Sequence, residues 1–161
     1  MANDGAIRTW SSLSGLAVVS PTRGYTFGTV EDFYFKAGTN AIDSFLINRG
    51  IPGLKALPVS AIVSFEKDAI VIRNDQAFIS LLPQLPTAQK LLDYSVISEK
   101  GEEVGAVSEI LVAVDPIVAT RVVGFDFVTS AKRKKRFSAN DILHYRTDTI
   151  VITDQDAKKL R

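Results

Sequence analysis

An internal duplication is the feature that most constrains the fold of this chain. The stretch GYTFGTVEDFYF at residues 24–35 returns as GEEVGAVSEILV at residues 101–112. Glycines and apolar side chains match at one offset of 77 residues in five pairs: Gly24 with Gly101, Gly28 with Gly105, Val30 with Val107, Phe33 with Ile110, and Phe35 with Val112. A repeat of this length in a chain of 161 residues predicts two copies of one small unit.

A second repeated block supports the same prediction. AIVSFEKDAIVIRNDQA at residues 61–77 aligns with DILHYRTDTIVITDQDA at residues 141–157, at an offset of 80. Each copy reads as a strand, a tight turn at Asp68 or Asp148, a second strand and a short polar stretch that can start a helical turn. Because the two offsets differ by three residues, loops that lie before Ile142 must differ in length between the copies.

The glycines of the first block predict hairpin corners and a coiled strand. Gly24 and Gly101 each follow a turn-forming sequence, and glycine permits the positive φ that many turns require. Beyond Gly28, the alternation of apolar and polar residues breaks between Val30 and Phe33, which indicates a β-bulge or strong coiling. A small barrel needs such a corner in order to close.

The composition favours a globular, mainly β chain. Hydrophobic residues make up 46% and charged residues 23%, Val, Ile, Phe and Thr dominate the apolar runs, and helical periodicity is scarce. The absence of cysteine excludes disulfides and thiolate sites. The N-terminus lacks the pattern of a secretory signal, and no apolar run reaches the roughly 18 residues of a membrane span. The most apolar window, residues 107–128, reads as two strands joined by a turn at Asp115–Pro116. We therefore expect a cytoplasmic location, with a peripheral position at a membrane as the alternative.

These patterns divide the chain into five segments. The linker, FISLLPQLPTAQK, is too apolar for a solvated tether. We therefore expect two small β-barrels that pack through it, and Trp10 as the anchor of an otherwise loosely held N-terminus. The segments are a lead-in (1–12), a first barrel (13–77), the apolar linker (78–90), a second barrel (91–157) and a tail (158–161).

Three stretches are candidate partner-binding sites. The linker residues either bury at the junction of the two units or form an exposed apolar ridge that binds a protein partner. A turn of residues 49–54, with Ile51 and Leu54, is either a recognition loop or a plain crossover between strands. The candidates in the linker are Phe78, Leu81, Leu82 and Leu85. The third stretch is a basic run, whose candidates are Lys132, Arg133, Lys134, Lys135 and Arg136.

The basic run is the one local electrostatic anomaly in a chain of net charge +1. We expect it in a hairpin loop from which the five side chains project into solvent. Three interpretations stay open: a solvated turn that keeps edge strands from pairing, contact with an acidic protein or anionic membrane surface, and contact with RNA. Few aromatic residues lie near the run, which disfavours RNA because base stacking would need them.

No catalytic or metal-binding constellation is evident in the sequence. His144 is the only histidine, and a lone imidazole cannot form a metal cluster. Strand alternation places Ile142, His144 and Arg146 on one face, opposite Leu143 and Tyr145, so we expect His144 to be an exposed or half-buried structural residue. The acidic pairs Glu31–Asp32, Glu102–Glu103 and Asp154–Asp156 are expected to be solvated surface. The glycines fit neither phosphate-binding motif. We therefore expect no cofactor, no metal and no enzymatic activity.

In chain order, these motifs resemble the PRC-barrel family. The resemblance rests on an apolar strand, a G-x3-G-x-V-x2-apolar hairpin, a loop with Gly and Pro, and then Leu-Pro-Val and Ile-Val-x-Phe-x-x-Asp-x-Ile-Val-Ile. It covers residues 13–75 and 91–155. The family's fold is known from the cytoplasmic part of the photosynthetic reaction centre H subunit and from the C-terminal domain of the ribosome maturation factor RimM.

The resemblance implies a compact six-stranded barrel in each half and a role in binding or assembly rather than catalysis. This chain lacks the membrane helix of the H subunit, and its first half resembles another PRC barrel rather than the N-terminal domain of RimM. The expected function is a non-catalytic protein-binding or assembly adaptor for a photosynthetic or other membrane-associated complex. A ribosome-associated or RNA-associated maturation factor is the alternative.

Overall fold

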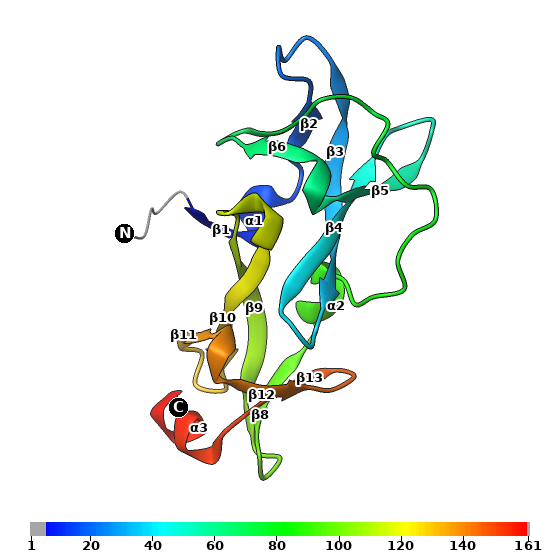
Figure 1. Ribbon diagram of the computed structural model, residues 1–161. Coiled ribbons are helices and arrows are strands. Elements are labelled where there is room, and N and C mark those ends of the chain that lie inside the picture. The colour runs from blue at the N-terminus through cyan, green and yellow to red at the C-terminus, as the bar shows by residue number, and fades with distance from the viewer. Residues whose placement is uncertain (1–5, 161) are drawn as a thin grey trace.

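The computed structural model describes residues 6–160 and consists mainly of β-strands, as the composition predicts (Figure 1). Short helices and 3₁₀ turns connect the strands. The strands are β1 (Ile7–Thr9), β2 (Ala17–Val19), β3 (Thr26–Lys36), β4 (Ala41–Asn48), β5 (Leu54–Pro58), β6 (Ile62–Phe65), β7 (Ala69–Ile72), β8 (Ser95–Ser98), β9 (Glu103–Ala113), β10 (Arg121–Thr129), β11 (Lys134–Ser138), β12 (Ile142–Tyr145) and β13 (Thr149–Ile152). The helices are α1 (Trp10–Leu13), α2 (Ala88–Leu91) and α3 (Asp154–Leu160), and the 3₁₀ turns are Val59–Ala61, Ile117–Ala119 and Ala139–Asp141.

All of these strands belong to one curled, mixed sheet. Its order is β12-β13-β8-β9-β10-β4-β3-β2-β7-β6, with β1, β5 and β11 attached to β9, β4 and β10. The halves meet where Ala41 of β4 pairs with Arg121 of β10. Two backbone hydrogen bonds flank this pair, from the N–H of Val122 to the carbonyl of Asn40 (2.8 Å) and from the N–H of Ile42 to the carbonyl of Thr120 (3.0 Å). This continuous half-barrel corrects the expected picture of two separate barrels packed through their linker.

The duplication is visible in the strand registers. Phe45 pairs with Leu57 across β4 and β5, and Phe125 pairs with Phe137 across β10 and β11, at the offset of 80. The predicted β-bulge is present in both copies, because the register shifts at Glu31 in β3 and at the equivalent position in β9. The three-residue difference falls in the β9–β10 connection, which holds the 3₁₀ turn Ile117–Ala119. A turn at Asp115–Pro116 joins these two strands, as the sequence predicts.

The repeated glycines serve two different purposes. Gly28 and Gly105 allow close approach of neighbouring backbone: a Cβ at Gly28 would lie 2.5 Å from the carbonyl oxygen of Asn48. At the corners, Gly101 adopts φ +87°, but in the first copy the positive φ belongs to Arg23 (+60°) rather than to Gly24. The prediction of a left-handed glycine therefore holds only for the second corner.

The short helix at the start of each half packs on a strand of the other half. β1 pairs with β9 of the second half, and α1 packs on the same strand. In return, α2 packs on β3 of the first half, and Tyr34 of β3 forms a bridge with Thr87. Figure 1 shows α1 beside β9 and α2 beside β3. Residues 7–12 are thus integrated into the sheet rather than loosely held, whereas residues 1–5 of the expected lead-in lie outside the described residues.

Two equivalent carboxylates complete this exchange. Oδ1 of Asp32 accepts hydrogen bonds from the N–H groups of Phe33 (2.9 Å) and Gln89 (3.2 Å). Oε1 of Glu109, which lies 77 residues later, accepts hydrogen bonds from the N–H of Ile110 (3.0 Å) and from the N–H of Ser11 (3.2 Å). Each acidic side chain therefore holds the helix of the opposite half, which corrects the expectation that Asp32 is solvated surface.

Burial raises the pKa of Asp32 above its ordinary value, and hydrogen bonds from Phe33 and Gln89 oppose this shift only in part. A carboxyl whose folded-state pKa is raised favours folding when protonated, and this contribution is lost as the pH rises through the folded-state pKa. Asp32→Asn keeps the acceptor oxygen without the charge. We expect the variant to be at least as stable as the wild type at about pH 7, with a weaker pH dependence between about pH 4 and pH 7.

Urea unfolding followed by Trp10 fluorescence at both pH values measures this effect. Glu31→Gln, at the exposed neighbouring position, is the control and should leave the stability within about 0.5 kcal/mol of the wild type. A loss of more than about 1 kcal/mol in Asp32→Asn at about pH 7 would show that the hydrogen bonds require the charged carboxylate.

Candidate functional site

The five basic residues lie in the turn between β10 and β11 and along β11, rather than in one loop. Lys132, with φ +64°, and Arg133 form the tight turn, whereas Lys134, Lys135 and Arg136 lie on β11 and pair with β10. Successive strand side chains point to opposite faces, so the five charges do not project together. The expectation of a fully looped run is therefore wrong for the last three residues.

Arg136 is engaged within the fold. Its Nε donates a hydrogen bond to Oδ1 of Asp126 (2.7 Å), and its Nη2 donates a second to Oδ2 (3.1 Å). Asp126 is only 6% exposed, and its carboxylate raises the pKa of the Arg136 guanidinium. Asp126 was not among the residues predicted from the sequence, although the offset of 80 that aligns β4–β5 with β10–β11 places it opposite Arg136.

Removal of Arg136 should therefore destabilise the fold. We expect Arg136→Gln to lower the free energy of unfolding by about 1 kcal/mol, because a nearly buried carboxylate loses a bidentate partner that is itself largely in solvent. Lys134→Gln, on the same strand, is the matched control and should cost less than about 0.5 kcal/mol. Thermal unfolding followed by circular dichroism measures both variants. Equal stability of the two variants would show that the ion pair between Arg136 and the nearly buried Asp126 carboxylate does not contribute to the stability of the fold.

The four candidate residues predicted in the linker differ in exposure. Phe78 is half-buried under Arg49, whose guanidinium carbon lies 4.4 Å from the ring centroid. Leu82 and Leu85 are also half-buried, whereas Leu81 is 85% exposed. The linker is therefore partly buried and partly exposed, and its binding of a partner stays a prediction.

Part of the linker lies against β5. The N–H of Ala56 donates to the carbonyl of Ile79 (2.9 Å), and the N–H of Ile79 donates to the carbonyl of Ala56 (2.8 Å). Nζ of Lys55 donates to Oγ of Ser80 (2.9 Å). Leu54 and Leu81 flank this contact, and the turn just before Leu54 carries a fully exposed Ile51. The linker ridge is defined here as Ile51, Leu54, Ile79 and Leu81, with exposed fractions of 103%, 46%, 45% and 85%.

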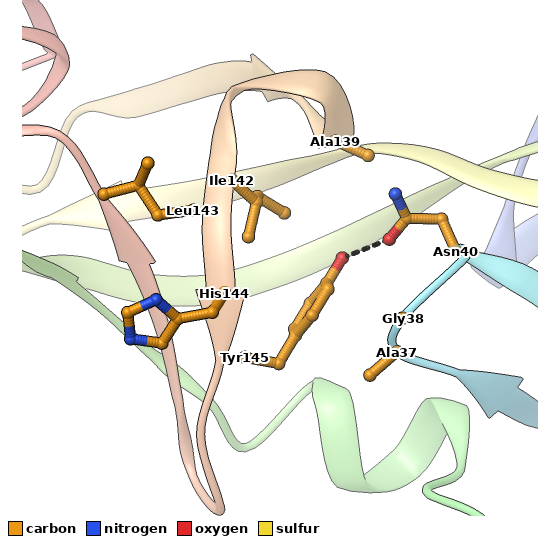
Figure 2. A pocket seen from close by; sticks show the side chains of 8 residues that line it. All are labelled: Ala37, Gly38, Asn40, Ala139, Ile142, Leu143, His144 and Tyr145. Carbon is orange, nitrogen blue, oxygen red and sulfur yellow. Dashed lines mark hydrogen bonds between the residues drawn. The ribbon is translucent and has the colours of Figure 1, made fainter.

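A pocket of about 300 Å³ lies at the junction of the halves (Figure 2). Asn40, from the β3–β4 turn, and Tyr145, from β12, point toward each other, and the Tyr145 hydroxyl donates a hydrogen bond to Oδ1 of Asn40 (2.8 Å). The Tyr145 ring packs edge-to-face on Phe35 (5.3 Å between centroids) and on Phe125 (6.4 Å). This tyrosine therefore contacts both halves.

Burial, and to a smaller extent the nearby Tyr94, raises the pKa of Tyr145 far above its ordinary value. The hydroxyl therefore stays protonated and acts as a hydrogen-bond donor. A neutral phenol and an amide can hold a polar group, but neither serves as a general base near neutral pH. Tyr145 and Asn40 thus connect the two halves by a hydrogen bond and offer no acid–base pair.

His144 is exposed, as predicted, and its side chain points away from Asn40 (Figure 2). Nε of Arg146 donates a hydrogen bond to its Nε2 (3.3 Å). The expected grouping of faces is wrong, because a register shift between Ile142 and His144 lets Ile142 and Tyr145 both pack against the core. Among residues 6–160, no group of three or more His, Cys, Asp or Glu side chains could hold a metal ion.

The described residues define an internally duplicated, β-rich domain protein with apolar and basic surface stretches. Residues 7–79 match the family model of the PRC-barrel domain, so this part of the chain is a PRC-barrel domain. Residues 88–160 are not assigned by a family model. A comparison with curated proteins finds no significant match. No helix within the described part of the chain is long and apolar enough to cross a membrane.

Proposed function

We propose that this PRC-barrel protein is a non-catalytic adaptor that binds a protein subunit of a larger complex through the linker ridge. The observation that carries the proposal is the exposure of Ile51 and Leu81, at 103% and 85%, on two segments that hydrogen bonds hold together. Large apolar side chains that gather on a surface favour a protein interface, because their burial there is worth about 25 cal/mol per Å².

The rest of the fold supports a binding role. The half-barrel and its shared core provide a platform on which the turn before β5 and the linker present the ridge. The pocket at the junction of the halves offers the neutral phenol of Tyr145 and the amide of Asn40 rather than an activated nucleophile. By the family resemblance, a photosynthetic or other membrane-associated complex is the proposed setting, and the second half acts as a further, diverged PRC barrel.

A ribosome-associated or RNA-associated maturation factor is the second candidate. The observation that favours it is the row of exposed basic side chains on the β10–β11 hairpin. Phosphate contacts from such a row would make binding strongly dependent on salt. An apolar interface would resist salt, so the two candidates predict opposite behaviour.

Affinity capture from the native lysate at low and high salt, with three variants, tests the proposal. Ile51→Ser combined with Leu81→Ser removes the ridge, and Val118→Ser, at an 80% exposed site in the second half, is the matched control. The third variant replaces Lys132, Arg133, Lys134 and Lys135 by serine and retains Arg136, because Asp126 needs its partner.

We expect one protein complex that survives high salt, persists with the Val118 and basic variants, and is lost with the ridge variant. Reconstitution of the complex from the purified partner and this chain then confirms direct contact. Salt-sensitive recovery of ribosomal particles that disappears with the basic variant would instead support the maturation factor. Recovery of the same complex by the ridge variant would overturn the adaptor interface.

A further inference from the structure

The outer edge of β11 differs from the equivalent edge of the first half. β5 and β11 correspond residue by residue at the offset of 80, so that Ala56 corresponds to Arg136. In the first half, the N–H and carbonyl of Ala56 point away from β4 and pair with Ile79 of the linker. The chain thus adds its own short extended segment to the β5 edge, in antiparallel orientation.

The second half lacks this added segment within the described residues. After Ala77 the chain extends toward β5, whereas after the equivalent Ala157 it continues as α3 to Leu160. β11 pairs only with β10 in the described part of the sheet. In Figure 1, β11 lies at the outer margin of the second half.

The hairpin geometry shows which backbone groups of β11 face outward. The N–H of Thr129 donates to the carbonyl of Arg133 (2.9 Å), so residue 133 is hydrogen-bonded toward β10. Antiparallel pairs alternate between hydrogen-bonded and non-hydrogen-bonded positions. The N–H and carbonyl groups of Lys134 and Arg136 therefore point outward, as those of Ala56 do in β5. A groove of about 280 Å³ adjoins this edge and is lined by Arg136 and Ser138 of β11 and by Lys159 of α3.

The charge of the edge selects its partner. Lys134, Lys135 and Arg136 lie on β11, and Lys132 and Arg133 on the adjoining turn. Two such edges would repel each other, so lysines here disfavour pairing between copies of this chain. Arg136 is already paired with Asp126, so the basic side chains at 132–135 would attract an extended segment with acidic side chains. Cross-strand pairs of opposite charge stabilise a sheet.

We infer that the outer edge of β11 binds an acidic, extended peptide segment of a protein partner, as an added antiparallel strand. This inference extends the proposed adaptor function, because it supplies a second contact for a protein partner. The contact is independent of the linker ridge, since the ridge belongs to the first half and β11 to the second. Backbone hydrogen bonds provide affinity in this mode of recognition, and side-chain charges select the sequence.

Fluorescence anisotropy with designed peptides tests the inference on the full chain. The probe is a labelled peptide of alternating Glu and Val, capped at both ends. One comparison peptide replaces each Glu by Lys, and another carries N-methyl groups on two pairs of adjacent residues, so that each edge of the peptide loses N–H donors. On the protein side, Lys134→Pro removes one outward N–H, and Lys134→Gln removes the same charge but keeps the N–H.

We expect the Glu/Val peptide to bind, and the Lys/Val peptide to show no measurable binding. N-methylation should weaken binding about tenfold or more, because several backbone hydrogen bonds are lost. Lys134→Pro should weaken binding more than Lys134→Gln does. Thermal unfolding of both variants is compared with that of the wild type, to confirm that they fold. The N-methylated peptide is decisive even if the proline variant fails to fold, because it is tested on the wild type. The ridge variant should bind the peptide unchanged.

Equal binding of the N-methylated peptide would overturn strand addition, because it would leave charge alone as the cause. Tighter binding of a single-stranded RNA than of the peptide would assign the basic hairpin to nucleic acid. A dimer in light scattering that Lys134→Pro dissociates would assign the edge to a second copy of the chain. Absence of peptide binding together with salt-resistant capture of a complex would overturn only this inference, whereas loss of the complex with continued peptide binding would overturn only the ridge interface.

Discussion

Replacing Trp10 with alanine is expected to lower the free energy of unfolding by about 3–5 kcal/mol. Trp10 is 5% exposed and packs edge-to-face on Phe33 of β3, with 5.2 Å between the ring centroids. Its helix also packs on β9 of the second half. The variant therefore leaves a cavity where the two halves meet, and a single domain with a total stability of about 5–15 kcal/mol would lose much of it.

Urea unfolding followed by far-ultraviolet circular dichroism measures this change, because the variant lacks the only tryptophan. Trp10→Phe is the matched control and should lose less than half as much, since it retains an aromatic ring against Phe33. Leu91→Ala in α2, the equivalent helix of the second half, should cost about 2–5 kcal/mol, because Leu91 is 1% exposed. A loss below about 1 kcal/mol for Trp10→Ala would show that the N-terminal segment does not hold the halves together.

Gly105→Ala is expected to destabilise the protein by about 1–3 kcal/mol or more. A Cβ at this position would overlap the carbonyl oxygen of Val128 and lie 2.6 Å from Cδ2 of Phe127. Both obstacles belong to β10, and Phe127 is fully buried in the core. Because neither the backbone nor a packed ring can move away freely, the strands must separate locally. The equivalent substitution Gly28→Ala should behave in the same way.

Gly38→Ala is the control for this prediction. A Cβ at Gly38 would meet no heavy atom within 4 Å, and its φ is not in the left-handed region. We expect a change within about 0.5 kcal/mol there. Differential scanning calorimetry of the three variants measures the effect. If Gly105→Ala melted as Gly38→Ala does, close approach of β9 and β10 would not be the reason for the repeated glycine.

Several features of the fold could be predicted from local sequence patterns. The repeated blocks predicted the duplication and the bulge between Val30 and Phe33, and the interrupted apolar window predicted the turn at Asp115–Pro116, because turns and bulges depend on a few adjacent residues. The same motifs carried the resemblance to the PRC-barrel family, which the family model shows for residues 7–79. Exposure of His144 also followed from its place on a short strand.

The candidate sites were predicted less well. The basic run was expected in a loop, because five adjacent charges outweighed the strand pattern. The alignment of Leu54–Pro58 with Lys134–Ser138 was the signal that could have placed three of them on β11. The alternation of β12 failed at a bulge, so the faces of Ile142 and Tyr145 were assigned wrongly. Whether either surface binds a partner stays a prediction.

The sequence by itself determined the β class, the two repeated units and the positions of their corners, because side-chain periodicity and turn chemistry act over a few residues. Only the tertiary structure decided how the units join. Asp32 receives the N–H of Gln89 from 57 residues away, and Tyr145 reaches Asn40 across 105 residues. Such contacts form only after the chain closes long loops and buries one shared core, and no local pattern encodes which half each short helix will cover.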